Sequence, residues 1–229
     1  EMALTEASRE DGIDAVAIVT PNHLHAAPAI AFLKAGIHVI CDKPLASQMN
    51  DALAIADAVK ESGKLFILTH NYTGYPMVRQ AKEMVAGQEL GSIRVIQVEY
   101  AQDWLTETAK NKQASWRTDP KQAGDGGSIG DIGTHALNLA NFVTGIKPNS
   151  LAADLSRFVT GRQVDDNAHI LLRYDNGARG ILWSSQVAVG NENSLKLLIY
   201  GDIGGIEWSQ ENPNQMIFTQ FGKPKTILT

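Results

Sequence analysis

Short apolar runs that alternate with helix-forming stretches constrain the fold of the first part of this chain more than any other feature. The runs are Asp14–Thr20, Ile37–Cys41 and Leu65–Thr69. Continuous apolar runs of this length are typical of strands that are buried on both faces of a parallel sheet. The stretches between the runs favour helix and end at Gly36 and Gly63, which are plausible C-terminal stops. The alternation predicts a doubly wound α/β domain with parallel strands.

After Pro76 the pattern changes, and strands that alternate or pair as hairpins come to dominate. Residues 95–100 alternate between apolar and polar side chains, which indicates a half-buried strand. Asp175-Asn176-Gly177 lies between two strand-like runs and is a strong hairpin signal. We therefore expect residues 1–74 to form the parallel α/β part, and residues 75–229 to form an α+β domain with a largely antiparallel open sheet.

The composition is that of an ordinary globular protein, with 44% hydrophobic and 20% charged residues. The formal net charge of −5 argues against nucleic-acid and membrane partners, which favour basic patches. Cys41 is the only cysteine, so a reducing compartment is allowed. No apolar run reaches the about 20 residues that span a bilayer, and the polar first residues differ from a secretory signal. We expect a cytoplasmic protein.

Polar residues follow the first two apolar runs, at the sheet edge where ligands bind in parallel α/β domains. Thr20-Pro21-Asn22-His23 offers groups that can bond a nicotinamide or a ribose, although a turn and helix cap explain it equally well. In Asp42-Lys43-Pro44, the lysine could stabilise a developing alkoxide, and the proline allows a sharp turn with a cis bond. The alternative for Lys43 is an ordinary solvated lysine.

A second group of polar residues follows residues 106–127, a polar stretch that we expect to be a long loop. Gly126-Gly127 precedes a predicted helix over Gly130–Val143, in which Asp131 and His135 are four residues apart and share a face. The ordinary pKa of a histidine, about 6.5, suits it to accept a hydroxyl proton near neutrality. Asp131 could orient His135 or hold a sugar hydroxyl; alternatively, Asp131 caps the helix and His135 is simply buried.

Other kinds of site find less support in the sequence. His23 and His25 are two residues apart and do not share a helix face, and the chain has no Cys/His cluster with zinc spacing, so we expect no metal. It also lacks the G-x-S-x-G motif of serine hydrolases. The four tryptophan residues that could line a sugar site are Trp104, Trp116, Trp183 and Trp208. Trp183 and Trp208 lie in predicted strands and fit a core or an interface better.

Taken together, these segments resemble the GFO/IDH/MocA family, the glucose–fructose oxidoreductase and inositol dehydrogenase family. Thr20-Pro21-Asn22-x-x-His25 is similar to its nicotinamide-side loop. Asp42-Lys43-Pro44 resembles its Glu-Lys-Pro motif, with Asp in place of Glu, and Gly126-Gly127-x-x-x-Asp131-x-x-x-His135 resembles its second-domain motif. The resemblance extends from Asp14 to about Gly222.

The resemblance implies an NAD(P)-dependent oxidoreductase that transfers hydride between nicotinamide and a CH–OH group of a sugar or polyol. It implies a catalytic trio in which His135 is the general base, Lys43 positions the hydroxyl and stabilises its charge, and Asp131 orients its partners. The implied substrate contacts are this trio and Asn138, which stands where inositol-type relatives often carry an acid. The implied cofactor contacts are Thr20, Pro21, Asn22, His25, Asp42, Lys43, Asn71, Tyr72, Trp116 and Arg117.

One family feature, the G-x-G-x-x-G turn that receives the cofactor pyrophosphate, does not precede Asp14. We therefore expect residues 1–74 to be the C-terminal part of a Rossmann domain, in a chain truncated at both ends. By itself this chain should bind NAD or NADP weakly or not at all, and we expect it to be inactive. We expect residues 75–229 to be a substrate and oligomerisation domain that forms a homo-oligomer through its sheet. An NAD-dependent glycosidase and a non-catalytic sugar- or cofactor-sensing regulator remain alternatives.

Overall fold

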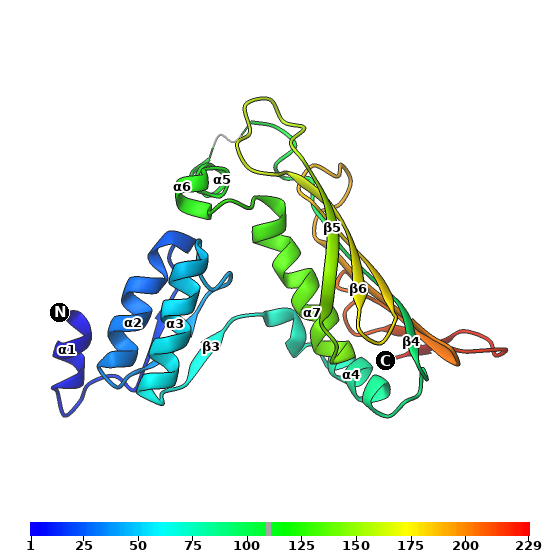
Figure 1. The fold of residues 1–229 in the computed structure, drawn as a ribbon, viewed down its shortest axis with the longest axis horizontal. Coiled ribbons are helices and arrows are strands. Elements are labelled where there is room, and N and C mark those ends of the chain that lie inside the picture. The colour runs from blue at the N-terminus through cyan, green and yellow to red at the C-terminus, as the bar shows by residue number, and fades with distance from the viewer. Residues whose placement is uncertain (109–110) are drawn as a thin grey trace.

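The computed structural model of the chain describes residues 1–108 and 111–229. It contains a three-stranded sheet and an eight-stranded sheet, each with its own helices (Figure 1). The smaller sheet is parallel, in the order β1-β2-β3. Its elements are α1 (Met2–Ala7), β1 (Ala15–Ile18), η1 (Asn22–Leu24), α2 (Ala26–Lys34), β2 (His38–Cys41), α3 (Met49–Ser62) and β3 (Phe66–Leu68). The predicted parallel α/β part is confirmed.

Apolar contacts between α2, α3 and the central strand hold the smaller part together. Val39 and Cys41 of β2 are fully buried, as is Leu33 of α2, and Ile55 of α3 is almost fully buried. Burial of one such aliphatic side chain contributes about 1.5–3 kcal/mol. Gly63 ends α3 in the left-handed conformation, with φ of 62°, which glycine adopts without steric cost.

The larger sheet has the strand order β11-β10-β9-β8-β4-β7-β6-β5, and only its β4–β7 pair is parallel among the described strands. The expected open, largely antiparallel sheet is confirmed. Asp175, Asn176 and Gly177 form the predicted turn between β6 and β7. The strands are β4 (Ile93–Ala101), β5 (Pro148–Ser156), β6 (Asn167–Tyr174), β7 (Arg179–Ser185), β8 (Ser194–Gly201), β9 (Gly204–Ser209), β10 (Met216–Gln220) and β11 (Thr226–Leu228).

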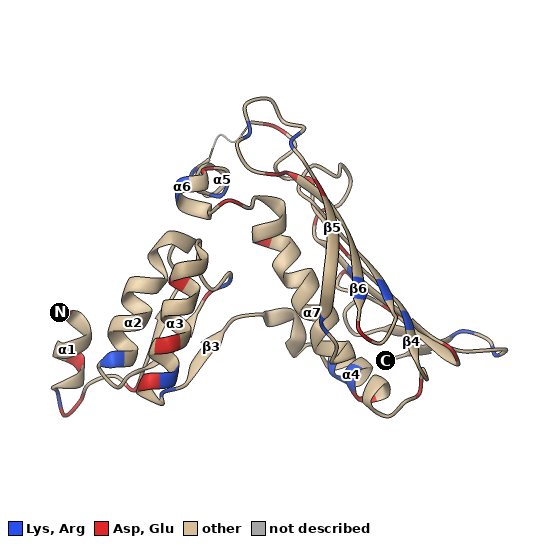
Figure 2. Cartoon of the chain, in the orientation of Figure 1, with Lys and Arg blue, Asp and Glu red and all other residues tan. Residues whose placement is uncertain are grey.

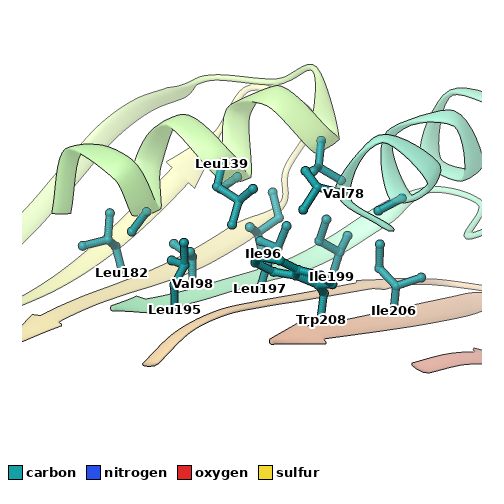
Figure 3. Close-up of a cluster of buried hydrophobic side chains, with 14 of the residues drawn as sticks. Val78, Ile96, Val98, Leu139, Leu182, Leu195, Leu197, Ile199, Ile206 and Trp208 are labelled. Carbon is teal, nitrogen blue, oxygen red and sulfur yellow. The ribbon is translucent and has the colours of Figure 1, made fainter. Parts of the chain in front are cut away.

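Helices α4 (Pro76–Ala86) and α7 (Thr134–Thr144) pack on one face of this sheet (Figure 1). Figure 3 shows Leu139 of α7 and Val78 of α4 above Ile96, Leu197 and Ile199 of the sheet. Strand residues alternate accordingly, so that one set faces these helices and the other faces away. The helix-covered face therefore contains the core, and it also supports the segment that leads into α7.

Two short helices occupy the stretch expected to be a loop, α5 (Lys112–Arg117) and α6 (Pro120–Ala123). The Asn111 side chain accepts a hydrogen bond from the Ala114 amide and caps α5, and Asp119 accepts from the Lys121 amide and caps α6. The expectation of an irregular loop is therefore wrong for these residues. They were hard to predict because each helix is too short to show an apolar period.

The surface of the described helices carries mixed charge. Acidic and basic residues are interspersed along α3 and α4 (Figure 2), which is typical of solvated helix faces. Within residues 1–108 and 111–229, none of the helices combines the length and the apolar character that crossing a membrane requires.

Candidate active site

The loop after β2 carries Lys43, which a cis peptide bond joins to Pro44. His25, which has 0% exposure, links this loop to the one after β1. Its Nδ1 lies 2.9 Å from the carbonyl oxygen of Pro44, and its Nε2 lies 2.9 Å from the carbonyl oxygen of Thr20. The buried imidazole thereby holds both loops at the carboxyl edge of the sheet and fixes the direction from which Lys43 projects.

Two further contacts join the loops at this edge. The Thr69 hydroxyl, just after β3, donates to Asp42 Oδ1 over 2.8 Å. The buried Asn22 side chain donates through Nδ2 to the carbonyl oxygen of Ala123 in α6, over 3.0 Å. The loops after all three parallel strands are therefore connected, and α6 is fastened to the first of them.

A π-helical turn, Ile129–Gly133, leads into α7, so the predicted regular helix from Gly130 is wrong in its first turn. Asp165 holds the start of this turn: its Oδ1 accepts from the Gly127 amide over 2.7 Å and its Oδ2 accepts from the Ile129 amide over 2.8 Å. A side chain at Gly127 would put its Cβ 2.0 Å from the Asp165 carbonyl oxygen, which explains the glycine. π-Helical turns are frequent at functional sites because they redirect side chains and carbonyl groups.

The π-helical turn brings Asp131 to Lys43. Lys43 Nζ donates to Asp131 Oδ1 over 2.7 Å and to the Asp131 carbonyl oxygen over 2.6 Å. The other carboxylate oxygen, Oδ2, accepts from Gln186 Nε2 over 2.9 Å and lies 3.3 Å from Arg117 Nε. Lys43 and Asp131 are each only 18% exposed at the side chain. The carboxylate is thus held by two cations and one amide.

His135, at the start of α7 and four residues after Asp131, is buried against three aromatic rings. Its ring centroid lies 4.9 Å from that of Tyr72, 5.4 Å from that of His70 and 6.2 Å from that of Tyr100. Its Nδ1 is buried without a hydrogen-bond partner among the described residues. The Asp131 carboxylate bonds Lys43 and Gln186, so any effect of Asp131 on the imidazole is exerted through space rather than by a hydrogen bond in the described part of the chain.

Burial and charge together lower the pKa of both Asp131 and His135, so both side chains are deprotonated at neutral pH. Burial by itself would raise the pKa of Asp131, but the charges of Lys43 and Arg117 outweigh burial and hold that pKa below its usual range. Burial lowers the pKa of His135 to about 3, with a further contribution from the charge of Lys43. At neutral pH the site therefore combines a carboxylate, an ammonium and a neutral imidazole, and the pKa of this imidazole lies well below the ordinary value of about 6.5 that the sequence led us to expect.

The remaining predicted residues differ in their contacts and exposure. The Arg117 guanidinium lies 4.2 Å from the ring centroid of Trp116, a cation–π contact. Asn71 is exposed at the start of η2 (Asn71–Gly74), and Asn138 is half-buried on α7. Among residues 1–108 and 111–229, no group of three or more His, Cys, Asp or Glu residues is placed to hold a metal ion.

Sequence reasoning missed four residues that shape the cluster: His70, Tyr100, Asp165 and Gln186. One signal was available for Gln186, because Ser-Ser-Gln interrupts the apolar run of β7 with polar residues that face a core. The other three are ordinary residues of strands or loops, and only the folded arrangement brings them to His135 or to the π-helical turn.

Comparison with known proteins gives the same two-part pattern. A model of the GFO/IDH/MocA C-terminal domain matches residues 78–207, and a model of an oxidoreductase family with an NAD-binding Rossmann fold matches residues 2–70. Levoglucosan dehydrogenase of Pseudarthrobacter phenanthrenivorans is 32% identical over 227 residues, which cover 89% of this chain and 57% of that protein.

Solved structures are similar over nearly the whole chain. An oxidoreductase from Sinorhizobium meliloti has 53% identity and a TM-score of 0.89, covering 100% of this chain and 60% of its own. An inositol dehydrogenase homolog from Azotobacter vinelandii, complexed with NADH and myo-inositol, has 34% identity and a TM-score of 0.92, covering 99% of this chain and 59% of its own. The chain spans 57–60% of the length of these three proteins.

Proposed function

The chain belongs to the GFO/IDH/MocA oxidoreductase family, and from that premise we propose that its protein transfers hydride between a nicotinamide cofactor and a CH–OH group of a sugar or polyol. The observation that carries the proposal is the meeting of Lys43, Asp131 and the neutral His135 between the two sheets. A sugar-sensing protein has no need of a proton acceptor held next to an ammonium group. A similar protein named levoglucosan dehydrogenase, and a similar inositol dehydrogenase homolog complexed with myo-inositol, support the substrate class.

We assign different tasks to the three side chains. The neutral imidazole of His135 accepts the hydroxyl proton during oxidation and returns it during reduction. The Lys43 ammonium donates to the substrate oxygen and stabilises the negative charge that develops on it. Asp131 holds Lys43 through two oxygens, 2.7 and 2.6 Å from Nζ, and so orients the ammonium rather than the imidazole.

The residues at the carboxyl edge of the smaller sheet fit a nicotinamide cofactor. Dinucleotides bind outside the carboxyl ends of parallel strands, where Thr20, Asp42 and Asn71 are exposed. A bound cofactor supplies the hydride acceptor or donor at this edge. We assign the cofactor contacts to Thr20, Pro21, Asn22, Asp42, Lys43, Asn71, Tyr72, Trp116 and Arg117, with His25 shaping the loops through its two carbonyl contacts.

The test is turnover by the full-length gene product with NAD⁺ or NADP⁺ and either levoglucosan or myo-inositol, followed by the absorbance of the reduced cofactor. Lys43→Ala and His135→Ala should each lower kcat by about 100-fold or more. Lys196→Ala is the matched control, because Lys196 also pairs with an acid, Glu99, over 2.9 Å but on the helix-free face of the sheet. Full activity of the Lys43 and His135 variants would refute the assignment.

We further propose that the second domain, residues 75–229, pairs with another copy of itself through the helix-free face of its sheet. Val95, Leu171 and Ile181 are exposed on that face and line a hollow of about 590 Å³. Contiguous exposed apolar patches mark interaction sites, and in a twofold dimer the same face of each copy covers that face of the other. Sedimentation should give a dimer or larger species, and Leu171→Glu should shift it towards monomer; a monomeric wild type refutes the idea.

We also retain a domain boundary near residue 74 and a cytoplasmic location as proposals. The boundary is supported by the change from a parallel to a largely antiparallel sheet between β3 and β4. The location is supported by the single cysteine, Cys41, which is buried at the end of β2. Limited proteolysis and subcellular fractionation test the two proposals separately.

A further inference from the structure

A chain of hydrogen bonds leads from the exposed Trp104 to Tyr72 beside His135. Trp104 Nε1 donates to Gln102 Oε1 over 2.9 Å, and Gln102 Nε2 donates to Asn193 Oδ1 over 2.8 Å. The hydroxyl of the buried Tyr100 donates to the same Asn193 oxygen over 2.7 Å. The Tyr100 and Tyr72 hydroxyls are themselves hydrogen-bonded to each other.

The indole of Trp104 fixes the direction of every bond in this chain. An indole N–H can only donate, so the Gln102 atom that faces it must be the carbonyl oxygen. The amide nitrogen of Gln102 then faces Asn193, which must present its own oxygen there. Because that oxygen can only accept, the Tyr100 hydroxyl gives its single proton to Asn193.

The Tyr100 oxygen is therefore left as an acceptor, and the Tyr72 hydroxyl must donate to it. Asn193 Nδ2 faces Gln210 Oε1 at 3.4 Å, which agrees with this orientation of the Asn193 amide. The single proton of Tyr72 is thus directed away from the site. Towards any other group, the Tyr72 oxygen offers only lone pairs.

The surroundings of Tyr72 make this polarity relevant to substrate choice. Its ring packs edge-to-face on the His135 imidazole, with ring centroids 4.9 Å apart. Tyr100, behind it, has 3% exposure, so the bond between the two hydroxyls is shielded from water on that side. Lys43 supplies a donor to the site, while His135 and Tyr72 supply acceptors.

We propose that Tyr72 is a specificity-determining residue whose oxygen accepts a hydrogen bond from a second substrate hydroxyl, next to the one that reacts. The inference rests on the proposed dehydrogenase function and adds to it a requirement for a vicinal or nearby diol whose second hydroxyl donates. A methyl ether at the second position has no proton to give, and a deoxy carbon has no oxygen, so both should be discriminated against.

The test uses whichever of levoglucosan and myo-inositol the full-length enzyme oxidises, with its mono-deoxy and mono-O-methyl derivatives. At one ring position both changes should raise KM by about 3- to 10-fold, the effect of one hydrogen bond. Tyr72→Phe should raise KM for the parent substrate to that of the deoxy derivative and leave KM for the deoxy derivative unchanged. A merely structural role would raise KM for both substrates alike.

Tyr100→Phe tests the direction of the bond. It removes the acceptor for the Tyr72 proton, so the Tyr72 hydroxyl becomes free to donate, and the O-methyl derivative should lose most of its KM penalty. Tyr174→Phe is the matched control, because the Tyr174 hydroxyl is also buried but has no hydrogen-bond partner among the described residues; its KM pattern should equal that of the wild type.

The possible failures are distinguishable. Turnover of neither parent substrate would overturn the proposed function, and this inference with it. Normal turnover in which Tyr72→Phe affects parent and deoxy substrates equally, or in which Tyr100→Phe leaves the O-methyl penalty unchanged, would overturn the role of Tyr72 and leave the proposed function standing.

Discussion

Asp131→Asn replaces a carboxylate that two cations hold with a neutral amide of nearly the same size. Lys43 Nζ lies 2.7 Å, Gln186 Nε2 lies 2.9 Å and Arg117 Nε lies 3.3 Å from the carboxylate oxygens. Hydrogen bonds to a charged group contribute about 1.5–3 kcal/mol each, and asparagine keeps only one acceptor oxygen without charge. The variant also leaves the ammonium and the guanidinium without their shared counter-ion.

The expected cost follows from these contacts. Removal of one partner of a buried ion pair costs about 3–5 kcal/mol. Lys43 and Arg117 are 18% and 21% exposed at the side chain, so water screens part of the loss. We expect the free energy of unfolding at pH 7 to fall by about 2–4 kcal/mol. Lys43→Met should cost less, because Arg117 still neutralises Asp131.

The pH dependence gives the sharper test. Because the folded-state pKa of Asp131 lies below its usual range, the carboxylate stabilises the fold fully above about pH 4. That stabilisation is lost as the pH falls through the folded-state pKa, where the wild-type carboxylate is itself protonated. The difference between the wild type and Asp131→Asn should therefore shrink in acid.

Urea unfolding followed by tryptophan fluorescence, from pH 7 down into the acid range, measures this difference. Asp57→Asn is the control, because Asp57 is exposed on α3, and it should change stability by less than about 0.5 kcal/mol. An Asp131→Asn variant as stable as the wild type at pH 7, or a difference that does not vary with pH, would refute the electrostatic account of the cluster.

Three further predictions concern neighbouring parts of the site. Because the pKa of His135 is about 3, kcat/KM should show no acid limb from this residue above about pH 4, and a limb near pH 6.5 would contradict the burial of a neutral base. Gly127→Ala should lower the free energy of unfolding by about 2–4 kcal/mol in urea titrations, because its Cβ would meet the Asp165 carbonyl oxygen at 2.0 Å, whereas Gly130→Ala, which has open space, should not. Asp165→Asn should weaken the hydrogen bonds that hold the start of the π-helical turn and should lower kcat, and Asp165→Glu should also have a kcat below that of the wild type. An unchanged kcat in both variants counts against this positioning role.

Much of the fold was predictable because its strands have distinct apolar patterns. The three parallel strands are short continuous apolar runs, and the β6–β7 hairpin turns at Asp175-Asn176-Gly177 as predicted. Strand β5 has no comparable signal, because nearly all its residues are exposed and hardly any faces the core. The helices α5 and α6 were missed because each depends on its cap, at Asn111 and Asp119, rather than on an apolar period.

The residue types of the candidate site were predictable, but the contacts between its side chains were not. The sequence order of Lys43 and Asp131 gives no distance between them, yet the motifs predicted that they would meet, and they do so over 2.7 Å. Gln186 reaches the same carboxylate from just beyond β7, 55 residues later in the chain. The Ser-Ser-Gln pattern marks Gln186 as unusual but does not identify Asp131 as its partner. The lowered pKa of His135 depends on burial among rings from separate segments, which only the tertiary structure provides.

The most direct test of the proposed chemistry follows a hydrogen atom from carbon to cofactor. The full-length protein is incubated with NAD⁺ or NADP⁺ and with levoglucosan or myo-inositol that carries deuterium on carbon, and the reduced cofactor is examined by mass spectrometry. We predict that deuterium appears in the reduced cofactor with the wild type and with Lys196→Ala, and that His135→Ala slows its appearance by about 100-fold or more. Reduced cofactor without deuterium, or equal transfer by His135→Ala, would contradict the proposal.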